Sequence, residues 1–122
     1  MPTILLIEDD ADLRKMLCKL LERENYVVLE AANGKEALGL AKATNPDLII
    51  TDIIMPEQDG IGTINELMRM DRDTKIIAIS GGGRMLNEDY LYIAKMLGAR
   101  HTFAKPFDNS ELLAKVGELI ME

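Results

Sequence analysis

Short apolar runs recur along the chain and alternate with longer segments of a different periodicity. The runs are TILLI (3–7), YVVLEA (26–31), DLIIT (47–51), KIIAIS (75–80) and HTFA (101–104). Each run has the length and composition of a β-strand. Three of them are almost continuous stretches of Ile, Leu and Val without alternation, which is typical of parallel strands that are covered on both faces.

The segments between the runs have apolar residues three or four positions apart, the spacing of amphipathic helices. Two such sets are Leu13, Leu17, Leu20 and Leu21, and Leu86, Tyr90, Ile93, Ala94 and Leu97. In the later helix we expect Leu86, Tyr90, Ile93 and Leu97 to form the stripe that faces the core.

Residues at the ends of these segments agree with the helical prediction. Asn33 with Glu36, and Asp108 with Glu111, have the spacing of capping boxes, although Asn and Asp take the place of Ser or Thr. Gly98 lies where a glycine that ends a helix is expected. The regular alternation of strand and helix predicts an α/β fold, a parallel sheet with helices on both faces.

Composition narrows the class of protein. The length of 122 residues predicts one domain over residues 1–122, and 48% apolar with 29% charged residues is ordinary for a soluble globular chain. The formal charge of −7 argues against direct binding to nucleic acid or anionic lipid. Cys18 is the single cysteine and excludes an intramolecular disulfide. The apolar run ILLI is too short for a membrane span, so we expect a cytoplasmic protein.

Polar and charged residues follow four of the five predicted strands. In a parallel sheet with right-handed crossovers, the carboxyl ends of all strands lie at one edge, where ligands bind in such folds. The residues predicted at this edge are Glu8, Asp9 and Asp10 after the first strand, Asp52 after the third, Ser80 after the fourth and Lys105 after the fifth. The second strand contributes nothing comparable.

Clustered carboxylates need a positive partner, because two of them about 4 Å apart repel by roughly 4 kcal/mol at an effective dielectric of ~20. Mg²⁺ fits this set of oxygen ligands and often shares its shell with a phosphate. With a divalent ion and Lys105 nearby, Asp52 has the makings of a nucleophile toward phosphorus, and a hydroxyl such as that of Ser80 would help to neutralise the transferring group.

Each of these residues also has a structural interpretation. The acidic run could be an exposed helix start, since acids favour a helix N-terminus. Lys105 and Ser80 could be ordinary loop residues. Asp52 is harder to explain structurally, because a carboxylate that interrupts an apolar strand gains nothing there. Their joint occurrence at predicted strand ends favours the functional interpretation.

The chain resembles the receiver domain of two-component response regulators over essentially all of its length. The resemblance rests on ILLIEDD (4–10), PDLIITDIIMPEQDG (46–60), IIAISG (76–81), LGA (97–99) and KPF (105–107). It implies a flavodoxin-like fold with strand order 2-1-3-4-5. It also implies a signalling switch that catalyses its own phosphorylation and dephosphorylation, for which the label of enzyme fits poorly.

The resemblance further implies specific roles. Asp52 would accept a phosphoryl group from a histidine kinase or a phosphotransfer protein. Asp9 would ligate Mg²⁺ directly and Asp52 would also be among the metal ligands. Glu8 would act largely through water, and the backbone carbonyl of Ile54 would be a further ligand. Two residues would then contact the phosphoryl oxygens: Ser80, after switching inward, and Lys105, whose bond to Pro106 is typically cis in this family.

Two positions depart from the family pattern. Thr102 stands where Tyr or Phe is usual, so the inward rotation of an aromatic ring is absent there or delegated to another side chain. His101 beside it is interpreted as a surface residue at a strand start, with a pH sensor as the alternative. The run GGGR (81–84) after Ser80 is interpreted as a mobile switch loop, with a phosphate-cradling nest as the alternative.

Output is expected as docking of an unknown downstream protein. Met85, Tyr92 and Met96 form a second stripe on the fourth predicted helix, and exposed Met and Tyr suit adaptable contact surfaces. Broader burial of that helix is the alternative. Two rival functions remain open, a Mg²⁺-dependent aspartyl-phosphate hydrolase and an adaptor that docks partners without phosphorylation. The hydrolase commonly has a second acid two residues after its nucleophile, where this chain has Ile54.

Overall fold

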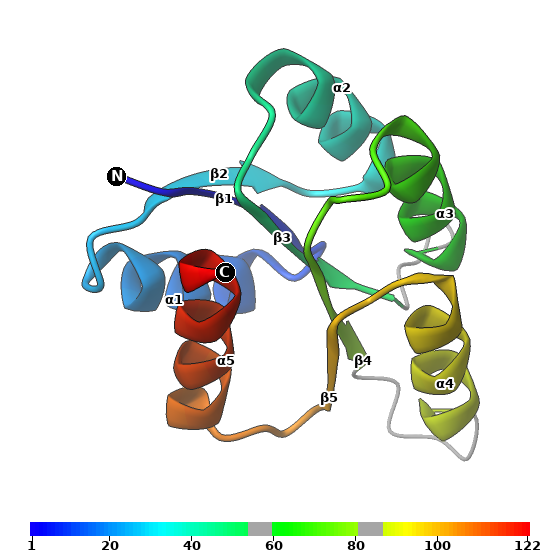
Figure 1. The fold of residues 1–122 in the computed structure, drawn as a ribbon. Coiled ribbons are helices and arrows are strands. Elements are labelled where there is room, and N and C mark those ends of the chain that lie inside the picture. Colours follow the sequence, from blue (N-terminus) through cyan, green and yellow to red (C-terminus); the bar gives the residue numbers. More distant parts are fainter. Residues whose placement is uncertain (54–59, 81–86) are drawn as a thin grey trace.

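The computed structural model describes residues 1–53, 60–80 and 87–122, with side chains described from residue 91 onward in the last range. Within this part of the chain, strands and helices alternate throughout (Figure 1). The elements are β1 (Thr3–Ile7), α1 (Ala11–Glu22), β2 (Val27–Ala31), α2 (Gly34–Thr44), β3 (Leu48–Asp52), α3 (Gly60–Met70), β4 (Ile76–Ser80), α4 (Asn87–Leu97), β5 (His101–Ala104) and α5 (Asn109–Met121).

The strands form one parallel sheet in the order β2-β1-β3-β4-β5, as predicted. The chain moves from β1 to one edge at β2, then returns to the other side of β1 at β3. The strand order therefore reverses between β1 and β3, and the carboxyl ends of these two neighbours lie side by side. In folds of this kind, ligands bind at such a reversal.

Two apolar cores lie on opposite faces of the sheet. Helices α2, α3 and α4 cover one face and α1 and α5 cover the other, as Figure 1 shows. Successive residues of a strand point to opposite faces, so Leu5 and Ile7 enter the first core while Ile4 and Leu6 enter the second. Strands β1, β3 and β4 are buried on both faces, which explains why their sequences show no alternation.

The predicted helix ends are present. The Asn33 side chain accepts a hydrogen bond of 2.9 Å from the Glu36 N–H, and Asp108 caps α5 through the Ser110 N–H. Gly98 ends α4 with φ 122°. The N–H groups of Gly98 and Ala99 bond back to the carbonyls of Lys95 and Ala94, the pattern of a Schellman motif. None of the described helices is long and apolar enough to cross a membrane.

The orientation predicted for α4 is wrong at one position. Ile93 was assigned to the core stripe, but its side chain is 42% exposed. Ala94 is fully buried instead, with Leu91 and Leu97 packed against the same core. Since a helix turns about 100° per residue, a shift of the buried stripe by one residue brings Ile93 to the surface. Leu86 and the side chain of Tyr90 lie outside the described part of the chain.

Substitution by Ala should have opposite effects on stability at Gly98, which ends α4, and at Gly39, which lies inside α2. A Cβ at residue 98 would lie 2.7 Å from Cε of Met68, and its φ of 122° disfavours any L side chain, so Gly98→Ala should destabilise the fold by roughly 1–3 kcal/mol. Gly39 lies inside α2 with no atom near its Cβ position, so Gly39→Ala should stabilise by roughly 0.5–1 kcal/mol. Urea unfolding of the two variants measures this difference, and equal free energies of unfolding would contradict it.

Candidate functional site

The ends of two neighbouring strands bring distant acids together. Glu8 and Asp9 directly follow β1, and Asp52 is the last residue of β3. Because Ile7 of β1 pairs with Thr51 of β3, the next residues of the two strands, Glu8 and Asp52, emerge beside each other. The sheet register therefore accounts for a cluster of residues that lie far apart in sequence.

The three acids lie close enough to share one cation. One carboxylate oxygen from each of Glu8, Asp9 and Asp52 lies within 4.8 Å of the others. Glu8 and Asp52 are only 2% and 4% exposed, whereas Asp9 is exposed to solvent. Two of the three charges are thus removed from water, and their mutual repulsion is weakly screened.

Lys105 bridges the two buried acids. Its Nζ lies 3.0 Å from Oε1 of Glu8 and 3.3 Å from Oδ2 of Asp52. Burial alone would lower the pKa of this ammonium, but the hydrogen bond to Glu8 and the charge of Asp52 raise it above its usual range. Lys105 is therefore held as a cation between two carboxylates.

The backbone of Lys105 is fixed as well. Its N–H donates to the Ser80 carbonyl at 2.9 Å, and its peptide bond to Pro106 is cis, as the family resemblance implies.

Glu8 is the acid with the most perturbed ionisation. The pKa of its carboxyl is raised from 4.5 to about 7, first by burial and then by the neighbouring charge of Asp52, which together outweigh the hydrogen bond and charge of Lys105. Near neutral pH this acid is consequently close to half protonated. A bound cation would favour its ionised form.

The chemistry of this donor set fits Mg²⁺. Three ionised carboxylates and one ammonium leave two negative charges, which one dication would neutralise. All the side-chain donors are hard oxygen atoms, the type that Mg²⁺ prefers. Asp10, adjacent to the cluster, has a structural role instead, since its side chain caps α1 by accepting from the N–H groups of Asp12 and Leu13. Ile54, the predicted backbone ligand, lies outside the described residues.

The chain after Asp52 is fixed by a close backbone contact. Ile53 donates its N–H to the Ile79 carbonyl at 2.8 Å, and its own carbonyl accepts the N–H of Gly60 at 3.0 Å. A Cβ at residue 60 would overlap the backbone of Ile53, so only glycine fits there. Ile53, the residue that directly follows Asp52, is thus fixed between β4 and the start of α3.

Ser80 supplies a buried hydroxyl for which the described part of the chain offers no hydrogen-bond partner. It is the last residue of β4, where Ile79 pairs with Asp52, and it is fully buried. Within the described ranges, its Oγ makes no hydrogen bond. A buried hydroxyl usually finds a partner, so this group is available to a ligand atom.

Thr102 lies on the adjacent strand. It is half-buried in β5 and pairs with Ala78 of β4. The aromatic ring of the next residue, Phe103, packs into the core under α1 and α5, 5.8 Å from the ring of Phe107. Because successive strand residues point to opposite faces, the Phe103 ring does not replace the aromatic side chain usual at position 102.

Two residues beside the site, Arg14 and Glu30, are not predictable from any motif in the sequence. Arg14 of α1 donates from Nη1 to the Glu8 carbonyl at 2.7 Å, and its Nε lies 3.3 Å from Oε1 of Glu30. Glu30 belongs to β2, the strand from which no contribution was expected. The one signal in the sequence is that Glu30 is a charged residue near the end of an otherwise apolar strand.

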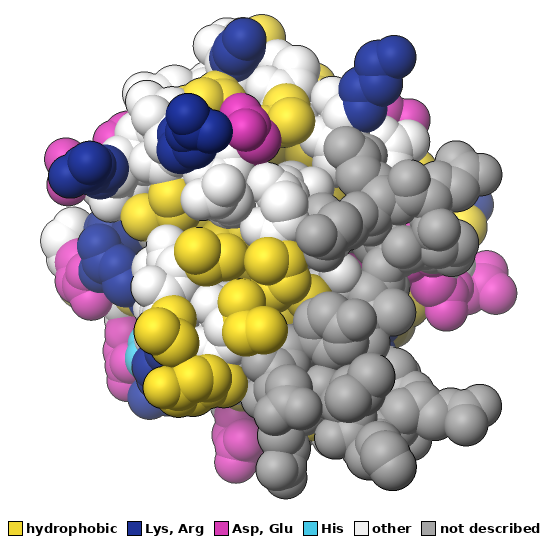
Figure 2. Space-filling view, turned by 90° about the vertical axis from the view of Figure 1, so that its right-hand side faces the viewer, with side chains coloured by type: hydrophobic (Ala, Val, Ile, Leu, Met, Phe, Trp, Pro, Cys, Tyr) yellow, Lys and Arg dark blue, Asp and Glu magenta, His cyan; other side chains and the backbone are white. Residues whose placement is uncertain are grey.

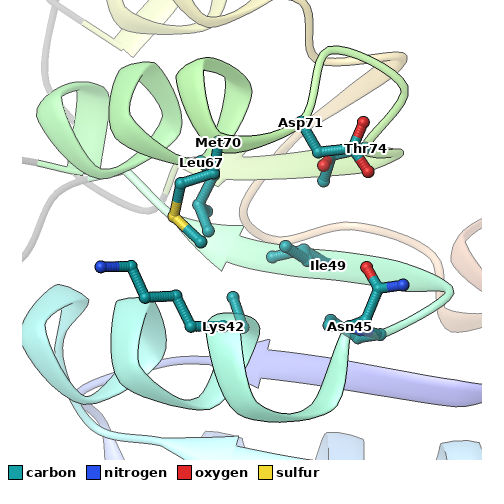
Figure 3. A pocket seen from close by; sticks show the side chains of 9 residues that line it. Lys42, Asn45, Ile49, Leu67, Met70, Asp71 and Thr74 are labelled. Carbon is teal, nitrogen blue, oxygen red and sulfur yellow. The ribbon is translucent and has the colours of Figure 1, made fainter.

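A cavity of about 280 Å³ lies away from the acids, between α2 and α3 (Figure 3). It opens over Ile49 near the start of β3, whereas Asp52 ends the same strand. Its polar side chains include Lys42, Asn45 and Asp71. None of the predicted site residues lines this cavity, so it is separate from the acidic cluster.

The chain matches one protein family over most of its length. A family model described as the response regulator receiver domain matches residues 4–117. The chain is 34% identical over 117 residues to the chemotaxis protein CheY of Thermotoga maritima, covering 95% of each chain. It is 33% identical over 109 residues to sporulation initiation phosphotransferase F of Bacillus subtilis, covering 89% of this chain and 86% of that protein.

The fold also matches a solved structure of a response regulator. The response regulator protein TrrA of Thermotoga maritima, solved in complex with Mg²⁺-BeF, superposes with a TM-score of 0.85 at 32% identity, covering 98% of this chain and 99% of that one. The chain spans about half the length of other curated relatives that it matches, which are transcriptional regulatory proteins.

The raised pKa of Glu8 predicts a pH-dependent stability when metal is removed. The folded state binds a proton at Glu8 more tightly than the unfolded state does, so the free energy of unfolding should fall as pH rises through the interval from 4.5 to about 7. The loss is at most about 3 to 4 kcal/mol, since one pKa unit corresponds to ~1.4 kcal/mol.

Urea unfolding in EDTA at several pH values, compared between wild type and Glu8→Gln, measures this effect. The difference between the two proteins removes the contribution of His101, whose pKa is lowered, mainly by burial. The wild type should lose stability relative to the variant as pH rises. Parallel curves for the two proteins would show that Glu8 is not perturbed as described.

Proposed function

The chain belongs to the family of response regulator receiver domains, and on this premise we propose that it is a phosphoacceptor switch with Asp52 as the acceptor. Receiver domains belong to two-component response regulators. The phosphoryl group would come from a phosphohistidine of a histidine kinase or a phosphotransfer protein. Since such kinases draw on ATP inside the cell, the cytoplasm is the compartment that we propose.

Asp52 is the proposed nucleophile. One of its carboxylate oxygens forms a bond to the phosphorus, while the phosphorus–nitrogen bond to the donor histidine breaks and its electron pair stays on the imidazole. The product is an acyl phosphate on Asp52. Because the reaction requires little covalent chemistry from the protein, positioning and charge neutralisation carry most of the catalysis.

Four other side chains have proposed roles. Lys105 pairs with a phosphoryl oxygen, and the Ser80 hydroxyl donates to another. Asp9 and Glu8 hold Mg²⁺, with the Ile54 carbonyl as an additional ligand. When bound, Mg²⁺ would neutralise the charge on the phosphoryl oxygens. The chain thus promotes its own modification and is a switch rather than an enzyme with turnover.

One observation supports this function more than any other. Two buried carboxylates at neighbouring strand ends share one ammonium, at 3.0 Å and 3.3 Å, and Ser80 Oγ at the next strand end lacks a partner within the described residues. A purely structural ion pair would explain Lys105 and one acid. It would not explain a second buried acid, a third acid within 4.8 Å and a buried orphan hydroxyl.

We also propose that α4 presents the partner-docking face. Tyr92 and Met96 are 67% and 70% exposed, and Ile93 joins them on the surface. Figure 2 shows hydrophobic side chains gathered on the side of the molecule where α3 and α4 lie. Met85, the third predicted residue of this face, lies outside the described part of the chain. Thr102 occupies the position of the usual aromatic switch residue, and we propose that it couples Ser80 to this face although it has no aromatic ring.

Phosphorylation by a small donor tests the chemistry. After incubation with acetyl phosphate and Mg²⁺, intact-mass measurement should show one added phosphoryl group on the wild type. The addition should be lost in EDTA and in Asp52→Asn, because the nucleophile and the charge neutralisation are both required. Asp12→Asn, an exposed acid on α1 outside the cluster, is the matched control and should be modified normally.

The same experiment separates the rival functions. Rapid turnover of p-nitrophenyl phosphate would indicate a hydrolase, whereas a slow stoichiometric modification indicates the switch. No modification of the wild type under any of these conditions would overturn the proposed chemistry. Partner binding that persists in Asp52→Asn would support a phosphorylation-independent adaptor.

The docking face predicts a selective loss of binding. In Tyr92→Ser/Met96→Gln, capture of the downstream partner by the phosphorylated chain should fall at least about tenfold, since Tyr is enriched among the residues that dominate interface energies and Met is enriched in interfaces. Phosphorylation of Asp52 should be unchanged. The control Met16→Gln/Met121→Gln replaces two other exposed methionines, 40% and 85% exposed. Equal capture by both double variants and wild type would place the docking face elsewhere.

A further inference from the structure

Arg14 connects the acidic site to the edge strand β2. Its side chain is 18% exposed and makes two contacts, from Nη1 to the Glu8 carbonyl at 2.7 Å and from Nε to Oε1 of Glu30 at 3.3 Å. A guanidinium is planar and directs its donors at fixed angles, so two acceptors in different directions fix its position. The carbonyl of Glu8 belongs to the peptide group that joins Glu8 to Asp9.

Both backbone polar groups of Glu8 are therefore tied to the end of β2, one directly and the other through Arg14. Its N–H donates to the Ala31 carbonyl at 3.0 Å, and its carbonyl is held by Arg14, which Glu30 anchors. Its side chain is fixed separately, by Lys105 at 3.0 Å and by the Asp10 N–H at 3.2 Å. Glu8 thus has several independent restraints.

Asp9 has no such restraints on its side chain. Within the described ranges its carboxylate makes no hydrogen bond or ion pair, and it is exposed to solvent. It still lies within 4.8 Å of the Glu8 and Asp52 oxygens. Its position in the cluster therefore depends on the backbone that carries it, and the peptide group on its amino side is the one that Arg14 holds.

We propose that Arg14 is a positioning residue that orients the Glu8–Asp9 peptide group, so that the Asp9 carboxylate is in place for Mg²⁺. This inference rests on the Mg²⁺-dependent chemistry proposed above. Preorganised ligands bind a cation more tightly because less conformational entropy is lost on binding. Glu30 neutralises the charge of Arg14, so the contribution of the pair to the site is geometric.

A purely electrostatic role for Arg14 predicts the opposite result. Removal of a positive charge near an acidic cluster strengthens the binding of a dication. Loss of an orienting hydrogen bond weakens it. The sign of the change in Mg²⁺ affinity therefore distinguishes the two roles, and this measurement needs no phosphoryl donor.

The test is calorimetric titration of the full chain with MgCl₂. Arg14→Gln should weaken the affinity about tenfold, the size expected for residues that support metal ligands. Arg14→Lys keeps the charge but lacks the planar fork, and its affinity should also fall. Lys15→Gln removes an exposed charge from the same helical turn and should bind Mg²⁺ as tightly as the wild type or slightly more tightly.

Affinity in Arg14→Gln equal to or tighter than that of the wild type would overturn the proposal, as would a wild-type affinity in Arg14→Lys. Circular dichroism in EDTA identifies the temperature range in which each variant is folded, and the titration is done there. With acetyl phosphate, the half-saturating Mg²⁺ concentration should rise in Arg14→Gln while the maximal rate at saturating Mg²⁺ stays near that of the wild type. A lower maximal rate with unchanged half-saturation would assign Arg14 a role other than orienting a metal ligand.

Discussion

The ammonium of Lys105, held between two buried carboxylates, is the interaction on which the rest of the site depends. Glu8 and Asp52 are almost fully buried, so each charge would be strongly unfavourable alone. One cation, at 3.0 Å and 3.3 Å, offsets part of that cost for both. The compensation is incomplete, because two acids share one ammonium and Asp9 adds a third negative charge. This imbalance favours a cation at this edge of the sheet, and that cation would in turn offset the charge of the phosphoryl group proposed to be transferred to Asp52.

The parallel sheet supplies the geometry that this interaction needs. Glu8, Asp52 and Lys105 lie at the carboxyl ends of β1, β3 and β5. The helices on both faces of the sheet pack against apolar residues that precede them in these strands. Register then fixes the neighbours, since Ile7 pairs with Thr51 and Ser80 pairs with Ala104, one residue before Lys105. Hydrophobic packing along the whole length of the strands therefore determines where a few polar atoms meet at their ends.

The features predictable from the sequence are those that depend on local pattern or on topology. Buried strands such as Leu48–Asp52 lack alternation, Asn33 caps a helix, and parallel topology brings the acids and Lys105 to one edge. Features set by tertiary contacts were not predictable. Ile93 and Ala94 both fit a helical stripe, and packing on the sheet selects Ala94. The Arg14–Glu30 pair joins α1 to β2 through side-chain geometry that no spacing encodes.

The arrangement also suggests why modification at one atom can alter the molecule. Phosphorylation of Asp52, as proposed, would convert a carboxylate that Lys105 already holds into a group with three further acceptor oxygens. The Ser80 hydroxyl is buried and has no hydrogen-bond partner among the described residues. One of the phosphoryl oxygens would then accept its hydrogen bond. Leaving a buried hydroxyl unpaired costs about 1–3 kcal/mol, so pairing it provides a driving force of that order. Because Ser80 ends β4 and its carbonyl accepts the Lys105 N–H, this energy acts at the point where β4 and β5 leave the core. An energy of that size, acting there, would be enough to shift the proposed switch between two conformations of the adjoining surface.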